Sequence, residues 1–285
     1  MADLTAIVLT KDEEKNIDKC LKSIQGFAKR IVVVDSGSTD RTMEVAKKYG
    51  ADVYQHPFEN YARQFNWGID ETCIDTKWVL RLDADERFTP ELCTRLEKEC
   101  KSHEHDDVNG FVLEAWLYFM GRRLKYGGSR KKKLMVFKTG IGRIEDRKMD
   151  EHTILSEGRT KEIKEKFLHY DYKDLNTYVK KLNWYAVREM QDYMEDRFYE
   201  FGFDGADKEI NSIRAKKTRY YRFPMFLRCW LYFIYAYIFC GNCLNGKEGF
   251  IYSFLYHLYY RILVDAKIFE QIKFPKKLEK TGDLK

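Results

Sequence analysis

The sequence lacks the features of a secreted protein stabilised by disulfides. Its 7 cysteines are odd in number and scattered along the chain, and only Cys240 and Cys243 have the Cys-x-x-Cys spacing of a zinc or redox site. That pair has no second pair to complete a metal site and lies beside an aromatic run. The N-terminus has no basic segment, and its apolar stretch is too short for a signal peptide. We therefore expect reduced thiols and a chain that stays in the compartment where it is made.

The sequence also lacks a long apolar run and a large excess of charge of one sign, and both absences exclude classes of protein. The uncharged run at 229–240 has 12 residues, whereas a helix that spans a bilayer needs about 20. Charge of one sign is not in large excess either, since 51 Lys and Arg residues face 45 Asp and Glu residues, for a net charge of +6. This excess fits anionic partners such as phosphates or lipid headgroups, and no nucleic-acid partner is expected.

The sequence does contain enough apolar material for a core. Of its 285 residues, 44% are hydrophobic and 34% are charged. This composition excludes a disordered acidic or basic tail and predicts one large domain, or one domain with an appendage.

The first half alternates short apolar runs with segments of helical periodicity. Strands are predicted at 4–9, 31–34, 51–54 and 78–82. Helices are predicted at 17–24, before residue 49, at 61–72 and after Thr89-Pro90. This alternation predicts an α/β fold, with a mainly parallel sheet flanked by helices on both faces. Ligands of such sheets bind at the carboxyl ends of the strands, where the polar clusters 35–38 and 83–85 fall.

Asp83 and Asp85 are the first candidates for chemistry. Two carboxylates this close repel each other unless a cation or hydrogen bonds compensate. Mg²⁺ or Mn²⁺, completed by substrate phosphates, is one compensation, and a solvated turn that caps the next helix is the alternative. The following residues do not fit an aspartate-nucleophile phosphatase or a calcium loop, and no Gly-x-Gly-x-x-Gly follows the first strand. Nucleotide-sugar transfer remains after this elimination.

Three segments carry a specific resemblance to a known family. They are residues 7–14 (IVLTKDEE), 33–42 (VVDSGSTDRT) and 82–86 (LDADE). In order and spacing they resemble the family 2 glycosyltransferases of GT-A fold, a Rossmann-like architecture, and within them the bacterial branch that builds lipopolysaccharide cores and surface polysaccharides. Residues 149–152 (MDEH) and 241–270 also look like that branch. Asp12 departs from the pattern, because such enzymes often carry Asn there.

The resemblance implies roles for residues at the expected crevice. Asp35, with backbone near Thr10, would contact the base of a nucleotide-sugar donor. Asp83 would contact the ribose or the metal, and Asp85 would bind a Mn²⁺ or Mg²⁺ ion that helps the diphosphate leave. The donor-binding residues so predicted are Thr10, Asp12, Glu13, Asp35, Ser36, Arg63, Gln64, Asn66, Asp83, Ala84, Arg130 and Lys132. The helix segment with Arg63, Gln64 and Asn66 is explained equally well as a plain amphipathic helix.

Inverting transfer also needs a base that takes the proton of the acceptor hydroxyl. By the family pattern Glu151 is favoured, with Asp150 as its rival and His152 as a neighbour of the metal or diphosphate. Ordinary surface charge is the alternative for each carboxylate. His169 is either a further site residue or a satisfied histidine at the domain edge.

The basic run 130–133 precedes a predicted strand at 134–137. Arg130 and Lys132 would clamp phosphate or lipid headgroups. The ordinary alternative is that these charged residues face solvent on an edge strand and prevent it from pairing with another chain.

The second half differs in composition from the first. Two aromatic runs, within about 220–265, predict a pair of short helices joined by a Gly/Asn turn, the second run ending at Arg261. Tyr and Trp suit the depth of lipid headgroups, and basic residues from Arg214 to Arg228 flank the first run. Contact with an anionic membrane surface is expected, with an oligomer interface or a helical lid as the alternative.

These observations predict a GT-A domain at 1–170 and a helical, membrane-interfacial region at 171–285. The expected activity is inverting, metal-dependent transfer of a sugar from a nucleoside-diphosphate donor, a UDP-sugar by preference. The expected acceptor is a lipid-linked or lipopolysaccharide-type saccharide at the cytoplasmic face of the cell membrane, where the protein is peripheral or monotopic. A nucleotidyltransferase and an inactive, membrane-bound nucleotide-binding protein are the alternatives. A homo-oligomer is compatible with membrane contact.

Overall fold

The computed structural model describes residues 1–127, 132–145, 152–194 and 218–275. The chain divides into two compact units, one of Met1–Tyr118 with Arg130–Asp171 and one of Phe119–Ser129 with Tyr172–Lys285. The expected division at residue 170 assigned the segment Phe119–Ser129 to the first part, whereas it groups here with the helices.

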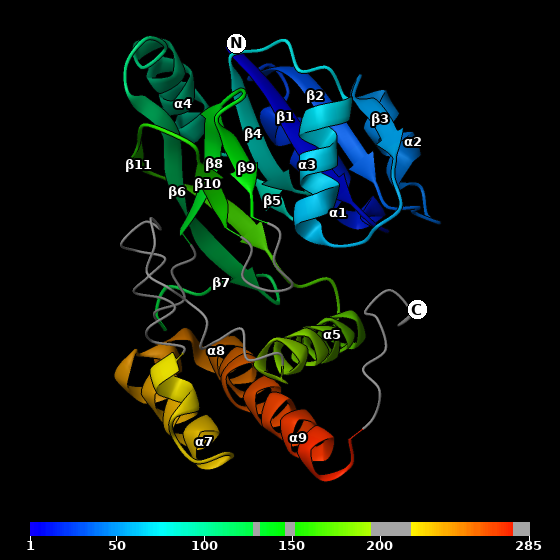
Figure 1. The fold of residues 1–285 in the computed structure, drawn as a ribbon. Helices are drawn as coiled ribbons and strands as arrows, with labels where there is room; N and C mark the ends of the chain where they lie inside the picture. The colour runs from blue at the N-terminus through cyan, green and yellow to red at the C-terminus, as the bar shows by residue number, and fades with distance from the viewer. Residues whose placement is uncertain (128–131, 146–151, 195–217, 276–285) are drawn as a thin grey trace. The chain divides into compact units, whose positions relative to one another are not determined.

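The first unit is built on a sheet whose first four strands run parallel in the order β3-β2-β1-β4 (Figure 1). These strands are β1 (Ala2–Thr10), β2 (Ala28–Asp35), β3 (Asp52–Gln55) and β4 (Trp78–Asp83). β1, β2 and β4 are buried along most of their length, as continuous Val, Ile and Leu runs require. The predicted α/β fold with a mainly parallel sheet is confirmed.

Helices cover both faces of this sheet. They are α1 (Glu14–Ile24), α2 (Thr42–Lys48), α3 (Tyr61–Glu71) and α4 (Pro90–Ser102). Alternate residues of β1 point to opposite faces, so Leu4 and Val8 pack with α1 and α4, whereas Ile7 packs with α3. Thr89 caps α4 as predicted, with its hydroxyl accepting a hydrogen bond from the Leu92 N–H.

Helix α3 approaches the sheet closely at Gly68. A Cβ atom there would lie 3.1 Å from Val34 Cγ2 and 3.2 Å from Ile7 Cγ2. Gln64 and Tyr61 lie on the same face of the helix, four and seven residues earlier. The glycine therefore lets these two polar side chains reach the ends of the strands.

The rest of the sheet is mixed. β8 (Lys132–Lys138) runs antiparallel between β4 and β6 (Val108–Phe119), β11 (Arg159–Tyr170) runs parallel to β6, and β5 (Glu86–Arg87) pairs with the end of β11. A separate two-stranded sheet consists of β9 (Gly142–Ile144) and β10 (Thr153–Leu155). Because β8 is an inner strand, the edge-strand explanation of the basic run is wrong.

The second unit is helical, with a short strand β7 (Arg122–Arg123). Its described helices are α5 (Leu175–Met194), α7 (Leu227–Ile234), η1 (Tyr235–Phe239), η2 (Asn242–Asn245), α8 (Gly246–Tyr252), η3 (Ser253–Tyr259) and α9 (Tyr260–Lys273). Asn245 joins the segment Phe119–Ser129 to them, since its Oδ1 accepts from the Lys125 N–H at 2.9 Å and its Nδ2 donates to the Tyr126 carbonyl at 3.0 Å.

Two helical runs joined by a Gly/Asn turn are present, as predicted, and Gly241 has the left-handed φ of 75° that the turn needs. The uncharged run ends at Arg261, but the helix continues to Lys273, beyond the predicted limit of about residue 265. Arginine is a favourable residue within a helix, and Arg261 also donates to Glu189 Oε1 at 2.9 Å inside the unit.

Candidate active site

Asp35, the last residue of β2, organises the loop that follows it. The residue is fully buried. Thr10 Oγ1 donates to one carboxylate oxygen at 3.0 Å, and the backbone N–H groups of Gly37 and Ser38 donate to the other at 2.9 and 2.8 Å. The parallel register pairs Thr10 directly with Asp35. Both predicted donor-binding residues therefore lie together at the carboxyl edge of the sheet, and contact of Asp35 with a base stays a prediction.

Asp12 holds the loop after β1 against the loop after β2. Its backbone has a φ of 51°, in the left-handed region where Asp and Asn are enriched. Its N–H donates to Ser38 Oγ at 2.8 Å, and its Oδ1 accepts from the Thr39 N–H at 2.8 Å. Next to it, the Glu13 N–H donates to Thr42 Oγ1 at 2.8 Å. Asp in place of the family's usual Asn thus keeps both the backbone conformation and an acceptor oxygen.

Gln64 connects α3 to the loop after β2. It is fully buried, and its Nε2 donates to Ser36 Oγ and to the His56 carbonyl, both at 3.1 Å. Its Oε1 lies 2.8 Å from His56 Nδ1, and the His56 ring stacks on Trp67. Ser36 and Gln64 were both predicted to bind the donor, and the structure brings them into contact.

Asn66 and Arg63 lie on other faces of α3. Asn66 Nδ2 donates to the Ile144 carbonyl at 2.7 Å, and its Oδ1 accepts from the Ile144 N–H at 3.0 Å, so the side chain ties α3 to β9. The Arg63 side chain is 55% exposed and pairs with Glu59. Of these two predicted donor contacts, only Arg63 is exposed.

Asp83, at the end of β4, belongs to a network of charged side chains. Tyr61 donates its hydroxyl proton to Asp83 Oδ1 at 2.5 Å, and Lys133 Nζ donates to Asp83 Oδ2 at 2.9 Å. The same ammonium group donates to Glu86 Oε1 at 2.6 Å, and Arg81 Nε donates to the Tyr61 hydroxyl oxygen at 3.0 Å. Lys133 therefore places one positive charge between the carboxyl groups of Asp83 and Glu86.

The two carboxyl groups of this network differ in pKa. Burial acts to raise the pKa of Asp83, but the neighbouring Lys133 and Arg81 outweigh it and hold that pKa well below its usual range. Burial raises the pKa of Glu86, and the attraction of Lys133 offsets this only in part. Asp83 is thus the group that stays ionised.

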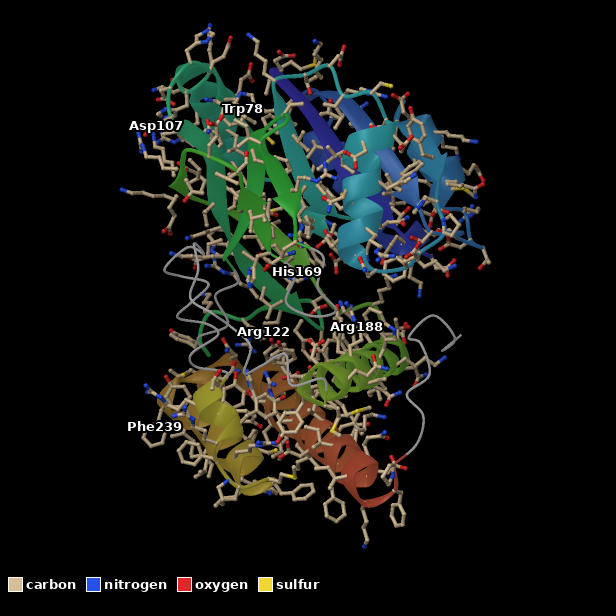
Figure 2. All side chains as sticks on the ribbon, in the orientation of Figure 1. Trp78, Asp107, Arg122, His169, Arg188 and Phe239 are labelled. Atoms are coloured by element: carbon tan, nitrogen blue, oxygen red, sulfur yellow. The ribbon has the colours of Figure 1, made fainter. Side chains whose placement is uncertain are left out.

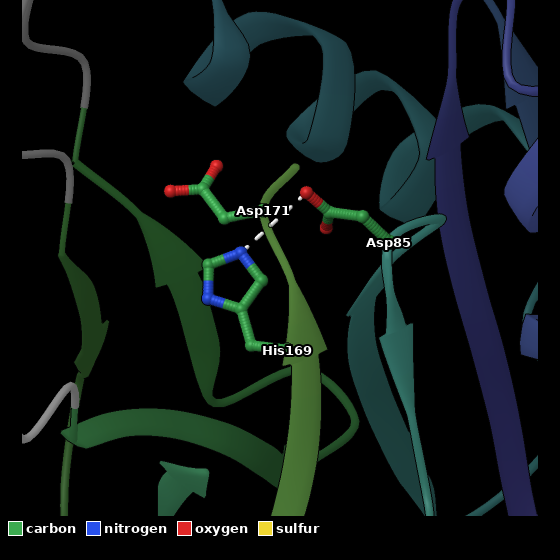
Figure 3. Close-up of side chains that lie close together, drawn as sticks. All are labelled: Asp85, His169 and Asp171. Atoms are coloured by element: carbon green, nitrogen blue, oxygen red, sulfur yellow. Dashed lines mark ion pairs between the residues drawn. The ribbon is translucent and has the colours of Figure 1, made fainter. Parts of the chain in front are cut away.

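Asp85 points to a different set of partners. In Figure 3 its carboxylate and the His169 ring face each other, and Asp171 lies beside them. One ligand atom from each lies within 4.8 Å of the others, and His169 Nε2 is 3.5 Å from Asp85 Oδ2. β5 and β11 set this geometry, since the register pairs His169 with Glu86 and the Tyr170 N–H donates to the Asp85 carbonyl at 2.8 Å.

This group fits a divalent cation. Around an octahedral Mg²⁺ ion, neighbouring ligand atoms are about 3 Å apart and opposite ones about 4.2 Å apart, so small side-chain movements would bring these atoms around one ion. The His169 side chain is 7% exposed, and its Nδ1 has no hydrogen-bond partner among the described residues. Two carboxylates and an imidazole are a ligand set that Mn²⁺ accepts. Asp85, His169 and Asp171 are therefore the residues that would hold the ion.

A family model described as glycosyl transferase family 2 matches residues 5–153, which is more than half of the chain. The chain belongs to glycosyl transferase family 2. Because this family transfers sugars, the alternative of a nucleotidyltransferase is set aside. The parallel sheet with polar clusters at its carboxyl edge is the architecture expected for a family 2 glycosyltransferase of GT-A fold.

Two curated relatives and one solved structure illustrate the likeness. An uncharacterized glycosyltransferase of Rickettsia typhi is 31% identical over 121 residues, which are 42% of this chain and 41% of that protein. The match thus spans less than half of that relative's length. The lipopolysaccharide core biosynthesis glycosyltransferase LpsC of Rhizobium meliloti is 25% identical over 94% of this chain and 92% of its own. A Mycobacterium tuberculosis glucosyl-3-phosphoglycerate synthase, solved with Mn²⁺ and UDP, covers 40% of this chain and 44% of its own at 17% identity and a TM-score of 0.32.

Several predicted site residues of this family 2 glycosyltransferase are placed elsewhere or are not described. Asp83 and His152, predicted as metal ligands, are not in the group around Asp85 among the described residues. The proposed bases Asp150 and Glu151, and also Arg130, lie outside the described residues. Ala84 is buried between the two aspartates. Lys132 points away from Asp83 and pairs with Glu162 at 2.8 Å.

Sequence reasoning missed three residues of the site. The sequence interpretation groups Lys133 with the other residues of a basic run. Successive side chains of a strand point to opposite faces, so Lys133 and Lys132 do not share a site. Tyr61 was read only as the start of a helix. Asp171 follows His169 by two residues, and residues two apart along a strand lie on the same face. Recognition of β11 as a strand would therefore have indicated that these two side chains lie together.

Proposed function

We propose that this protein is an inverting, metal-dependent glycosyltransferase. It takes a sugar from a nucleoside-diphosphate donor, a UDP-sugar, and transfers it to a lipid-linked or lipopolysaccharide-type saccharide. Family membership supports sugar transfer, and the relative named for lipopolysaccharide core biosynthesis, which matches along 94% of this chain, supports the acceptor class. We place the reaction at the cytoplasmic face of the cell membrane, with the protein bound peripherally.

The group of Asp85, His169 and Asp171 carries the proposal of a metal. A Mn²⁺ or Mg²⁺ ion bound there would neutralise the diphosphate as it leaves. Asp85 and Asp171 supply negative charge for the cation, and His169 supplies a neutral nitrogen ligand from a buried position. Lys133 and Tyr61 keep the Asp83 carboxylate ionised and fixed, which suits it to accept hydrogen bonds from ribose hydroxyls.

A carboxylate near the acceptor completes the mechanism. Glu151 is our candidate for the base that removes the acceptor proton, and Asp150 is the alternative. In inversion, the acceptor oxygen attacks the anomeric carbon on the face opposite the diphosphate, the carbon–oxygen bond to the diphosphate breaks, and the base receives the proton.

The metal proposal is tested by Asp85→Asn, with Asp107→Asn as a matched control. Asp107, labelled in Figure 2, is a 66% exposed carboxylate of the same unit that pairs with Arg159. Asp85→Asn should weaken Mn²⁺ binding, measured by electron paramagnetic resonance, by about 10- to 100-fold and reduce transfer at least as much. The control should change neither. Full activity in the presence of EDTA would show that the metal assignment is wrong.

The donor is tested by thermal shift with Mn²⁺ present. A ligand that binds only the folded state raises the melting temperature, so UDP should raise it more than GDP or ADP at equal concentration. An equal shift for all three nucleotides would contradict the UDP assignment. The metal assignment would not be affected, because the Asp85→Asn experiment tests it separately.

A further inference from the structure

We propose that the helical unit docks on a lipid bilayer containing anionic lipids, and that it does so through an apolar stripe along α7 and η1. This inference deepens the proposed function by naming the surface that meets the membrane. It rests on the proposed function only for the side of the membrane, because lipid binding needs neither donor nor metal.

The stripe has helical spacing and is exposed. Its members recur at i, i+3, i+4, i+7, i+8, i+11 and i+12, and they are Leu227, Trp230, Leu231, Ile234, Tyr235, Ile238 and Phe239. Their exposed fractions run from 40% at Ile234 to 76% at Phe239, which Figure 2 labels. Phe250 and Phe254, four residues apart on α8 and η3, are 48% and 45% exposed. Exposed apolar residues in one row, rather than singly, mark an interaction surface.

The inward side of α7 and η1 carries the small side chains of Cys229 and Ala236, and one charged residue of α7 is buried beside them. Arg228 is 2% exposed and Asp265 is fully buried, and the Arg228 Nε donates to both Asp265 oxygens at 3.1 and 3.0 Å. Deeper in the same unit, buried Glu189 accepts hydrogen bonds from Tyr221 and Tyr260. In a helix surrounded by water the large apolar side chains are expected on the inward side, whereas here the largest ones are exposed and an arginine is buried. Arg228 is therefore no lipid contact, contrary to the sequence-based expectation.

The charge around the stripe selects a membrane over a second protein copy. Residues 218–247 contain no Asp or Glu. Exposed Arg219 and Arg222 precede the stripe, and exposed Lys247 follows it. At the far end of α9, Lys273 Nζ lies 5.7 Å from the ring of Phe269, which is 48% exposed. Cations beside exposed aromatic rings suit anionic headgroups above acyl chains, whereas two copies of this surface would bring like charges together.

The length of the helix indicates that it lies in the interface. The segment Leu227–Phe239 has 13 residues, so it is about 20 Å long at 1.5 Å per residue. A hydrocarbon core is about 30 Å thick. Among the described helices, none by itself has both the length and the apolarity for a membrane span, although Leu227–Phe239 and Asn242–Lys273, bent by 64°, satisfy both together.

The test is flotation of the full chain with vesicles, without donor. Vesicles of phosphatidylcholine and phosphatidylglycerol should bind the protein, and phosphatidylcholine alone should bind it about tenfold more weakly. Leu231→Glu should reduce binding about 10- to 100-fold, because a carboxylate replaces a side chain buried in lipid. Leu175→Glu is the matched control, since Leu175 on α5 is 46% exposed and Leu231 is 47% exposed, and it should bind as the wild type does.

A second measurement keeps the inference testable if Leu231→Glu does not fold. Brominated lipids should quench the tryptophan fluorescence of the wild type, and Trp230→Phe should remove most of that quenching while vesicle binding persists. Absence of vesicle binding by the wild type would overturn the inference. So would a dimer in lipid-free solution that Leu231→Glu dissociates, because the stripe would then belong to a second copy. Neither result would affect the metal and donor tests.

Discussion

The two units of the chain differ most in the apolar side chains that they leave exposed. In the first, Trp78, Phe111 and Phe137 are at most 1% exposed. In the second, Arg228 and Asp265 are buried, whereas Trp230 and Phe239 are 51% and 76% exposed. Removing apolar surface from contact with water lowers the free energy of the protein. The first unit therefore removes most of its large apolar side chains from water by its own folding, whereas the second leaves a row of them exposed, which is the surface that we propose to contact a membrane.

Buried charges also serve different purposes in the two units. Asp83, Lys133 and Glu86 lie at the strand ends beside the candidate metal group. Asp265 instead holds the start of α7, where the Phe226 N–H donates to it at 2.8 Å and Phe226 has a φ of 63°. The first cluster prepares a site, and the second fixes a helix whose outer face is apolar.

The largest effect on stability is expected at Asp265. Asp265→Ala leaves the Arg228 charge buried without its partner, which should cost about 3–5 kcal/mol of unfolding free energy. Urea denaturation followed by circular dichroism measures the loss. Replacing both partners, Arg228→Met with Asp265→Leu, should recover much of it. A loss below about 1 kcal/mol would contradict the view that this pair organises the helical unit. Mn²⁺ affinity should not change.

A smaller effect is expected at Lys133. Lys133→Met leaves the Asp83 and Glu86 carboxyl groups facing each other, at a cost of about 1–3 kcal/mol. Burial raises the pKa of Glu86, so its contribution to stability is present at low pH and is lost as the pH rises through that pKa. The cost should therefore be larger at pH 8 than at pH 5.

Lys132→Met is the matched control for this change. Lys132 is the neighbouring residue on β8, and it pairs with Glu162, whose side chain is 52% exposed. Exposed pairs contribute about 0–1 kcal/mol, so unfolding in urea should change little and without the pH dependence. Equal costs for the two lysines would show that the inner network does not stabilise the strand ends.

The smallest effect on stability is expected at Arg63. Its pair with Glu59 is exposed on both sides, so Arg63→Ala should change the unfolding free energy by less than about 1 kcal/mol. If Arg63 contacts the donor, the same change raises the KM for the nucleotide sugar several-fold and leaves kcat nearly unchanged. An unchanged KM would show that Arg63 does not contact the donor.

The parallel half of the fold was predictable because its signals are local. Continuous apolar runs predicted β1, β2 and β4, and Thr89-Pro90 predicted the start of α4. The mixed half of the sheet was not predicted as strands, except at β8. β11 (RTKEIKEKFLHY) carries many charged residues, and its pairing with β6 joins segments about 50 residues apart along the chain. No local pattern predicts such a pairing.

The candidate site was predictable in part for the same reason. Thr10, Asp35 and Asp85 follow strands, so their place at the sheet edge could be inferred from topology alone. The partners of Asp83 and Asp85 could not, since Lys133, His169 and Asp171 come from β8, from β11 and from the residue after β11. These contacts depend on strand register, and a shift by one residue would turn each side chain to the other face.

Composition and spacing by themselves determined the α/β class, the edge of the sheet where the acidic clusters lie, and the apolar character of the last third of the chain. These follow from hydrophobic periodicity and turn chemistry, which act between near neighbours in the chain. Only the tertiary structure decided that Lys133 neutralises Asp83 while Asp85 joins His169 and Asp171, and that Arg228 turns inward so that Trp230 faces out. Those outcomes depend on which distant charges meet, because a charge is stable away from water only where an opposite charge or a hydrogen-bond partner lies beside it.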